Sequence, residues 1–154
     1  MTSILVAPDS FKGTFSSVQV AQYIAAGIRD EGLSATECPL ADGGEGTLDV
    51  LLSALSGEQR FHFVQGPLGR KVVACWGWVL EQQLAIIEVA QACGLHLSGR
   101  TPTDAVRAST SGVGELMITA VAAGAETIVA ATGGSATTDG GQGAIDSIQG
   151  YEEV

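Results

Sequence analysis

Residues 4–14 have the sequence ILVAPDSFKGT, and this stretch decides the fold. Its first four residues form a continuous apolar run, which is typical of a strand buried on both faces. A polar loop, residues 9–14, follows at once. Ser16 or Ser17 can then cap a helix whose apolar side chains repeat at helical spacing as far as Ile28. The order of strand, loop and helix indicates the start of an α/β fold.

The same order repeats further along the chain. A second strand is expected near residues 36–40, where it leads into the glycine-rich loop 42–46. A helix begins by Thr47, with leucines on one face and a glycine beyond its end. Apolar and polar residues then alternate through residues 60–63, which suggests a third strand. Repeated units of this kind predict a parallel sheet with helices on its faces.

The second half of the chain has a different character. Residues 71–79 and 84–89 are two β-prone runs that are typical of an antiparallel pair, so we place a subdomain boundary near Gly66. A helix is expected from about Ser111. A further buried strand, residues 127–131, runs into a second glycine-rich loop.

Composition and charge restrict the class of protein. The chain has 154 residues, 45% of them hydrophobic, and a net charge of -10, as expected of a globular protein that binds neither nucleic acid nor an anionic membrane. No apolar run reaches membrane-spanning length and no signal peptide is recognisable, so we expect a cytoplasmic protein. The 3 cysteines form no C-x-x-C pair, which favours buried reduced thiols.

Three loops contain the glycine, aspartate and lysine residues that are the best candidates for binding a ligand or for catalysis. Each follows a short strand, and glycines in such loops let the backbone approach a ligand while free N–H groups favour anions. Asp42 and Asp139 each precede a Gly-Gly pair, which suits a site for Mg²⁺ and phosphate. The same carboxylates could instead accept a hydroxyl proton, or simply be turn residues. Lys12 is the only Lys or Arg of the three loops, and it is our candidate for neutralising phosphate charge.

Several other classes of site lack their motifs. The sequence contains no G-x-x-x-x-G-K-[ST] phosphate loop and no G-x-S-x-G nucleophile motif. From the residues alone, the interpretation stops at an α/β protein with a crevice that handles phosphate.

Six blocks of the sequence, taken together, resemble the type I glycerate kinase family. They occur in the family's order and at suitable spacing. The blocks are APDSFKG (7–13), ADGGEGT (41–47), GPLG (66–69), IEVA (87–90) ahead of GL (94–95), SGVGEL (111–116) and GGSATTDGG (133–141).

The resemblance implies transfer of phosphate from ATP to a hydroxyl of D-glycerate, with the 2-hydroxyl favoured and Mg²⁺ assisting. It also implies a Rossmann-like parallel sheet with flanking helices, plus part of a second α/β subdomain containing the antiparallel β pair. On this basis residues 1–65 are the first segment of the Rossmann-like domain, and residues 66–154 begin the second. The active site would lie between the two domains.

The resemblance also assigns roles to individual residues. Lys12, Asp42 and Asp139 become the expected catalytic residues, and the two aspartates are also the expected metal ligands. The residues expected to line the substrate and phosphate pockets are Asp9, Ser10, Gly43, Gly44, Glu45, Gly133, Gly134, Ser135 and Thr137.

The chain departs from the family in its length, because members of the family are considerably longer. It therefore looks like the N-terminal portion of such an enzyme, and two alternatives stay open. One is an inactive remnant that at most binds ligand. The other is a different small-molecule enzyme on a similar scaffold, since a fold does not fix a function. Formation of a homo-oligomer is also left open.

Overall fold

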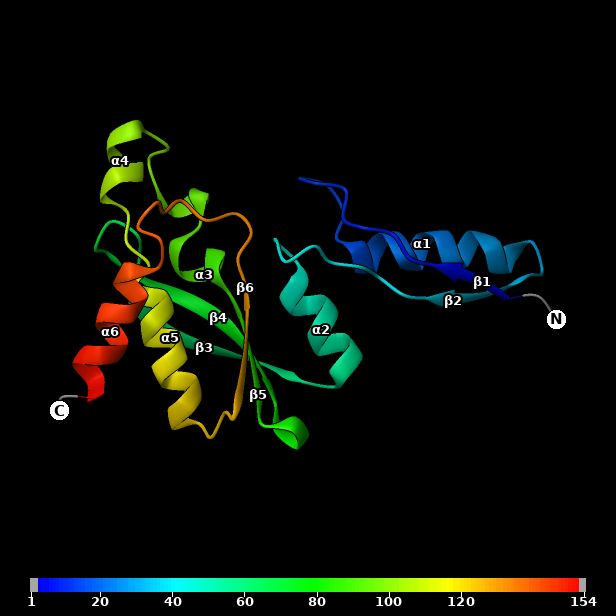
Figure 1. Cartoon of the computed structure of the whole chain (residues 1–154). Helices are drawn as coiled ribbons and strands as arrows, with labels where there is room; N and C mark the ends of the chain where they lie inside the picture. Colours follow the sequence, from blue (N-terminus) through cyan, green and yellow to red (C-terminus); the bar gives the residue numbers. More distant parts are fainter. Residues whose placement is uncertain (1–2, 153–154) are drawn as a thin grey trace. The chain divides into compact units, whose positions relative to one another are not determined.

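The computed structural model describes residues 3–152, and the contacts within it divide the chain into two compact units (Figure 1). The first unit is Met1–Asp42 and the second is Gly43–Val154. Each unit has a sheet of its own. The domain boundary that we expect at residues 65 and 66 lies inside the second unit, and it stays a prediction about the domains of the family.

The first unit is one strand–helix–strand motif. Strand β1 (Ser3–Val6) pairs in parallel with β2 (Ser34–Glu37), and helix α1 (Ser17–Asp30) connects them. Ser16 caps this helix as predicted, because its hydroxyl accepts the Gln19 N–H while the Gln19 side chain accepts the Ser16 N–H. The parallel pair with its connecting helix confirms the α/β class that the first stretch of sequence predicts.

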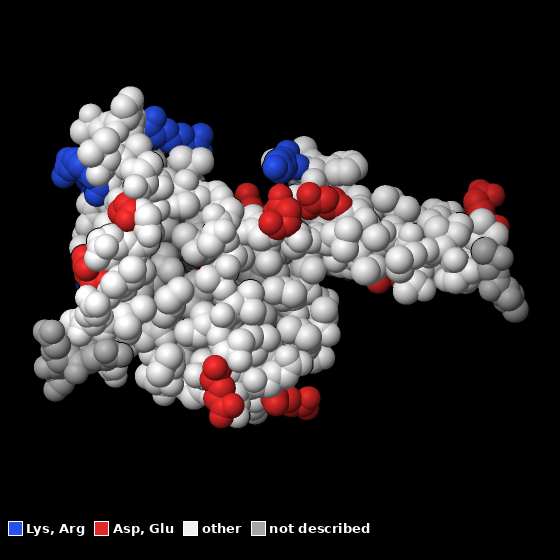
Figure 2. Space-filling view, viewed as in Figure 1, with Lys and Arg blue, Asp and Glu red and all other residues white. Residues whose placement is uncertain are grey.

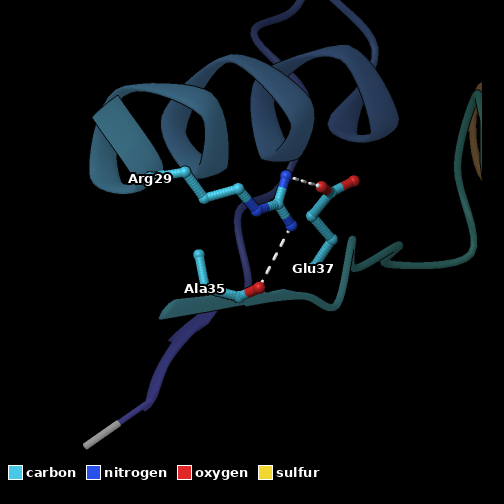
Figure 3. A network of polar contacts seen from close by, with 3 residues as sticks. All are labelled: Arg29, Ala35 and Glu37. Carbon is cyan, nitrogen blue, oxygen red and sulfur yellow. Dashed lines mark hydrogen bonds and ion pairs between the residues drawn. The ribbon is translucent and has the colours of Figure 1, made fainter. Parts of the chain in front are cut away.

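Arg29 fastens the end of α1 to β2, as Figure 3 shows. One guanidinium nitrogen donates to a Glu37 carboxylate oxygen at 2.9 Å, and the other donates to the Ala35 carbonyl at 3.0 Å. Both partners lie on the same strand. The pair is largely exposed, so we expect it to fix geometry more than to add stability.

The expected burial of β1 on both faces is wrong. Val6 is buried against Ala21 and Ala25 of α1, but Ile4 is 37% exposed and Leu5 is 64% exposed. The reason is that the first unit contains two strands and a single helix within the described residues, so there is no second layer to cover the other face.

The second unit contains a four-stranded mixed sheet. Its order is β3 (Glu58–Gln65), β4 (Lys71–Val79), β5 (Leu84–Glu88) and β6 (Thr127–Ala131). The β4–β5 pair is antiparallel as predicted, and β5 pairs in parallel with β6. Strand β3 is present too, but it pairs antiparallel with β4 and does not extend the first parallel sheet.

The second unit contains the helices α2 (Thr47–Leu55), α3 (Val89–Cys93), α4 (Pro102–Arg107), α5 (Ser111–Ala122) and α6 (Gln142–Glu152), with short 3₁₀ turns at η1 (Leu80–Gln82) and η2 (Leu95–Leu97). Helix α2 packs on one face of the sheet, α3 and α5 pack on the other, and α6 packs against α5. The α2 and α5 starts agree with the sequence-based expectation. No helix within residues 3–152 is both long and apolar enough to cross a membrane.

The core of the second unit has two layers. On one face Trp76 and Trp78 pack with α5, and the Arg60 guanidinium lies over both indole rings at 5.6 and 5.2 Å. On the other face the leucines of α2 pack against Ile86. Strand β5 is therefore buried on both sides. Strand β6, which was also expected to be buried, lies at one edge of the sheet and exposes Val129.

Candidate functional site

Two glycine-rich loops meet at the sheet edge where β5 and β6 end. Glu88 and Ala131, the last residues of these parallel strands, lie opposite one another. Beyond them the Gly133 N–H donates to the Gly43 carbonyl at 2.8 Å. A Cβ on Gly133 would overlap the backbone of Gly44, so only glycine permits this approach. The structure thus brings together two loops that the sequence places about 90 residues apart.

The loop after β6 is anchored to α3 and η2. The Ala136 N–H donates to the Cys93 carbonyl at 2.8 Å, and the Leu95 N–H donates to the Gly134 carbonyl at 3.0 Å. The hydroxyls of Ser135 and Thr137 lie 2.6 Å apart. These anchors fix both predicted lining residues, Ser135 and Thr137, in one arrangement.

Cys93 lies beneath this loop and is fully buried. Burial raises the pKa of its thiol, and hydrogen bonds with Ser135 and Thr137 act in the opposite direction. Cys93 and Cys75 are buried free cysteines as expected, whereas Cys38 is exposed.

Asp139 joins the beginnings of two helices. One of its carboxylate oxygens accepts the N–H and the hydroxyl of Thr110, both at 2.8 Å, and the N–H of Gly143 at 3.2 Å. The other accepts the Gly141 N–H at 3.2 Å. Burial alone would raise the pKa of this carboxyl, but the hydrogen bonds outweigh burial and lower it. Because both oxygens serve the fold, the geometry favours a positioning role for Asp139 over contact with a metal or substrate.

Sequence reasoning missed the role of Glu88. Its side chain is 4% exposed, and one oxygen accepts the Leu48 N–H at 2.8 Å in the first turn of α2. The residue before this helix, Gly46, has no side chain to cap it. Glu88 therefore supplies from β5 the cap that α2 lacks, and it fixes the loop 43–46 to the sheet. The sequence feature that points to this role is a single charged residue, Glu88, within the otherwise apolar run 84–90.

We expect Glu88→Ala to lower the free energy of unfolding of the second unit by about 2 kcal/mol, because the buried N–H of Leu48 would lose its acceptor. Glu88→Gln keeps an acceptor oxygen and should lose less. Urea denaturation followed by tryptophan fluorescence measures this, since both tryptophans belong to the second unit. Equal stability of Glu88→Ala and the unaltered chain would show that the cap is dispensable.

Glu45 is an exposed residue of the loop 43–46 in the second unit, and the first unit holds the other predicted site residues, Asp9, Ser10, Lys12 and Asp42. The Cys38 N–H donates to the Val6 carbonyl and the Leu40 N–H to the Pro8 carbonyl, so the chain beyond β1 runs beside the chain beyond β2. This arrangement brings the segment of Asp9 and Ser10 to the same end of the sheet as Asp42.

Lys12 lies at the tip of a tight turn. The Thr14 N–H donates to the Phe11 carbonyl at 2.8 Å, and Gly13 has a φ of 80°, as a type II turn requires at its third position. The Lys12 side chain is exposed and forms no ion pair within residues 3–152. A lysine presented in this way is available to a ligand.

Neither aspartate belongs to a preformed metal site. Within the described part of the chain no group of three or more His, Cys, Asp or Glu residues could hold a metal ion. Mg²⁺ commonly uses one or two carboxylates together with phosphate oxygens and water. The exposed Asp42 fits that chemistry, whereas the hydrogen bonds on Asp139 do not.

A pocket of about 580 Å³ lies elsewhere in the second unit, among β3, β4, α5 and α6. Its lining includes His62, Lys71, Glu115 and Tyr151. None of the residues predicted from the sequence to form the site lines it.

Residues 4–151 match the model of the glycerate kinase family, so the chain belongs to that family. It is 42% identical over 150 residues to the glycerate kinase of Halalkalibacterium halodurans and 42% identical over 147 residues to the glycerate 2-kinase of Escherichia coli. These alignments cover 96% and 94% of the chain.

A solved structure agrees with this assignment. The chain superimposes with a TM-score of 0.84 and 38% identity on a Salmonella typhimurium LT2 protein assigned as a glycerate kinase 2, over 95% of this chain and 40% of that one. The chain also spans only 40% and 39% of the lengths of the two curated relatives.

Proposed function

We propose that this chain carries part of a glycerate kinase, an enzyme that transfers the terminal phosphate of ATP to a hydroxyl of D-glycerate, the 2-hydroxyl being favoured. The observation that supports it most strongly is the meeting of the loops at Gly43 and Gly133 where β5 and β6 end. Ligands of α/β sheets bind at the carboxyl ends of strands, and glycine-rich loops there can surround phosphate with backbone N–H groups.

The proposed chemistry uses few side chains. The glycerate hydroxyl oxygen attacks the terminal phosphorus, the bond from that phosphorus to the bridging oxygen breaks, and ADP departs. Asp42 orients the hydroxyl and accepts its proton, or holds Mg²⁺. Lys12 stabilises the charge on the transferred group. A bound Mg²⁺ would neutralise phosphate charge.

The remaining predicted residues shape the site in this proposal. Asp9, Ser10 and Glu45 line the substrate pocket, and the glycine loops with Ser135 and Thr137 surround phosphate. Asp139 holds the starts of α5 and α6 in place.

The test is an assay of ADP release by the purified chain with ATP, Mg²⁺ and D-glycerate. Asp42→Asn should lower turnover by about 10²-fold or more, because a carboxylate that orients or deprotonates the hydroxyl is lost. Asp30→Asn is the control, since Asp30 is an exposed carboxylate at the end of α1.

Two results would count against the proposal. Turnover that does not depend on glycerate would show that glycerate is not the phosphate acceptor. A well-folded chain with no turnover would mean that these residues bind ligand at most.

A further inference from the structure

Strand β3 forms one edge of the four-stranded sheet, and no other strand within residues 3–152 pairs with its outer side. At the end of β3 the Gly66 N–H donates to the Arg70 carbonyl, so Gly66 turns its backbone toward β4. The Gln65 N–H instead donates to the Glu115 carboxylate and turns outward. Because backbone groups alternate in direction along an antiparallel strand, the odd-numbered residues of β3 point their N–H and C=O groups away from β4.

The outward backbone groups of Gln59, Phe61 and Phe63 form an unpaired edge. No hydrogen bond within residues 3–152 uses their N–H or C=O groups. Natural proteins usually protect such an edge with a lysine, a proline or a β-bulge. Strand β3 has no lysine or proline, its register with β4 is unbroken from residue 58 to residue 65, and Arg60 is held in an ion pair with Glu58. This edge is therefore open to another β-strand.

An apolar surface lies beside this edge. Phe61, Phe63 and Val73 are 65%, 67% and 55% exposed, and Phe63 lies directly opposite Val73 in the β3–β4 register. Helix α2 packs on this face of the sheet against Cys75 and Val79 of β4, but it leaves the three side chains uncovered. We call Phe61, Phe63 and Val73 the β3 patch.

The distribution of charge permits contact at this edge. The chain has a net charge of -10, so two copies repel each other where acidic side chains meet. On the face of the second unit seen in Figure 2, Lys and Arg gather around α4 and several Asp and Glu lie at the opposite end, while much of the surface between them carries neither. The unpaired edge and the β3 patch consist of uncharged residues, so repulsion between copies is small there.

The unpaired groups are symmetric about Phe61, because Gln59 and Phe63 lie two residues to either side of it. A second copy of β3 laid antiparallel, with Phe61 opposite Phe61, places Gln59 of each copy opposite Phe63 of the other. Each of these pairs exchanges both N–H···O=C bonds, so every unpaired group of the edge gains a partner. The two β3 patches then lie on one face of the joined sheet, where their aromatic rings meet. We propose that β3 is a self-association edge, at which two copies of this chain form a twofold dimer with a continuous sheet.

The size of the contact indicates a weak dimer. A phenylalanine side chain has about 150–250 Å² of surface, so the exposed two-thirds of both rings amount to roughly 250 Å² in each copy. With Val73, Gln59 and the strand backbone included, two copies together bury on the order of 1,000 Å², which is the lower limit for a specific interface. We therefore expect a Kd on the order of 10 to 100 μM.

The experiment is sedimentation equilibrium of the 154-residue chain between about 1 and 300 μM. The mass should rise from that of one chain to that of two and then stop, because twofold pairing uses up the edge. Phe63→Lys should raise the Kd at least about tenfold, since a charge in the β3 patch opposes strand pairing. Val106→Lys is the matched control, because Val106 is an 82% exposed apolar residue of α4, and it should leave the Kd unchanged. Circular dichroism confirms that both variants are folded.

Amide hydrogen exchange followed by NMR tests the pairing of the edge itself. At about 300 μM, the N–H groups of Gln59 and Phe61 should exchange roughly three- to tenfold more slowly in the unaltered chain than in Phe63→Lys. The Val64 N–H already faces β4, so its exchange should differ little between the two.

Three outcomes contradict the proposal. A folded chain that stays monomeric up to about 300 μM overturns it and leaves the edge to a partner other than this chain. A dimer that Phe63→Lys does not weaken overturns it too, because the contact then lies elsewhere. Growth beyond two copies also counts against it, since a closed twofold contact cannot propagate. The measurements involve neither ATP nor glycerate, so their result is independent of the proposed function.

Discussion

Replacing Asp139 with alanine should lower the free energy of unfolding of the second unit by about 3 to 5 kcal/mol, because four hydrogen bonds to a charged acceptor disappear together. The variant leaves the N–H of Thr110 and of Gly143 without this partner at the starts of α5 and α6. Urea denaturation followed by tryptophan fluorescence measures the loss.

Asp146→Ala is the matched control for this substitution. Asp146 is an exposed carboxylate on α6 that accepts one hydrogen bond from the Gln142 side chain, so its loss should change stability by about 0.5 kcal/mol or less. Asp139→Asn should lie between the two, since an amide oxygen still accepts from Thr110. If Asp139→Ala were no less stable than Asp146→Ala, the carboxylate would not be holding the helices.

The same carboxylate makes the stability depend on pH. Its pKa is lower in the folded chain than in the unfolded chain, where an aspartate titrates near about 3.9. Its contribution is therefore complete above the unfolded value and is lost as the pH falls through the folded value. The unaltered chain should lose more stability than Asp139→Asn on acidification below about pH 4.

Gly112→Ala should cost about 3 kcal/mol, because the added Cβ would overlap the Gln65 carbonyl oxygen. The neighbour is backbone at the end of β3, so no flexible side chain can move aside. The Glu115 carboxylate accepts the Gln65 N–H at 2.9 Å, which holds the same backbone against α5. The measurement is again urea denaturation with tryptophan fluorescence.

Gly150→Ala provides the control for the glycine substitution. Gly150 lies in α6, and a Cβ there would meet no heavy atom within 4 Å. Alanine favours helix over glycine, so this variant should be neutral or more stable by up to about 1 kcal/mol. A Gly112→Ala variant as stable as Gly150→Ala would mean that β3 and α5 can separate without cost.

Local sequence patterns predicted the helix starts, because a helix start depends on residues that are close together in the sequence. The start of α1 follows from a serine ahead of apolar residues at helical spacing, and the start of α2 follows from a glycine-rich loop ahead of a leucine face. Alternation identified β3 as a strand but could not name its partner, because strand pairing depends on residues beyond the strand. Burial of β1 and β6 was overestimated for a similar reason, since apolar sequence does not reveal how many layers surround a strand.

The residues of the candidate site also differ in how well the sequence alone predicts their roles. The glycine loops were recognisable because tight turns and close backbone approach demand glycine, and Gly133 meets Gly43 as such loops require. The carboxylates were harder to interpret. An aspartate before two glycines has the same local sequence whether its carboxylate binds a ligand or stabilises the fold. The role of Asp139 depends on its hydrogen bonds with Thr110, which is 29 residues away in the sequence. Glu88 acts on Leu48, 40 residues away.

The small core of the first unit has a consequence for how the chain melts. Within residues 3–152, Val6, Ala21 and Ala25 form the one buried apolar cluster of this unit, whereas the second unit has two larger clusters. So few buried side chains offset little conformational entropy, so this unit should open at a lower free energy than the rest. Heating the chain would then not be a two-state process, and a single Tm would describe neither unit.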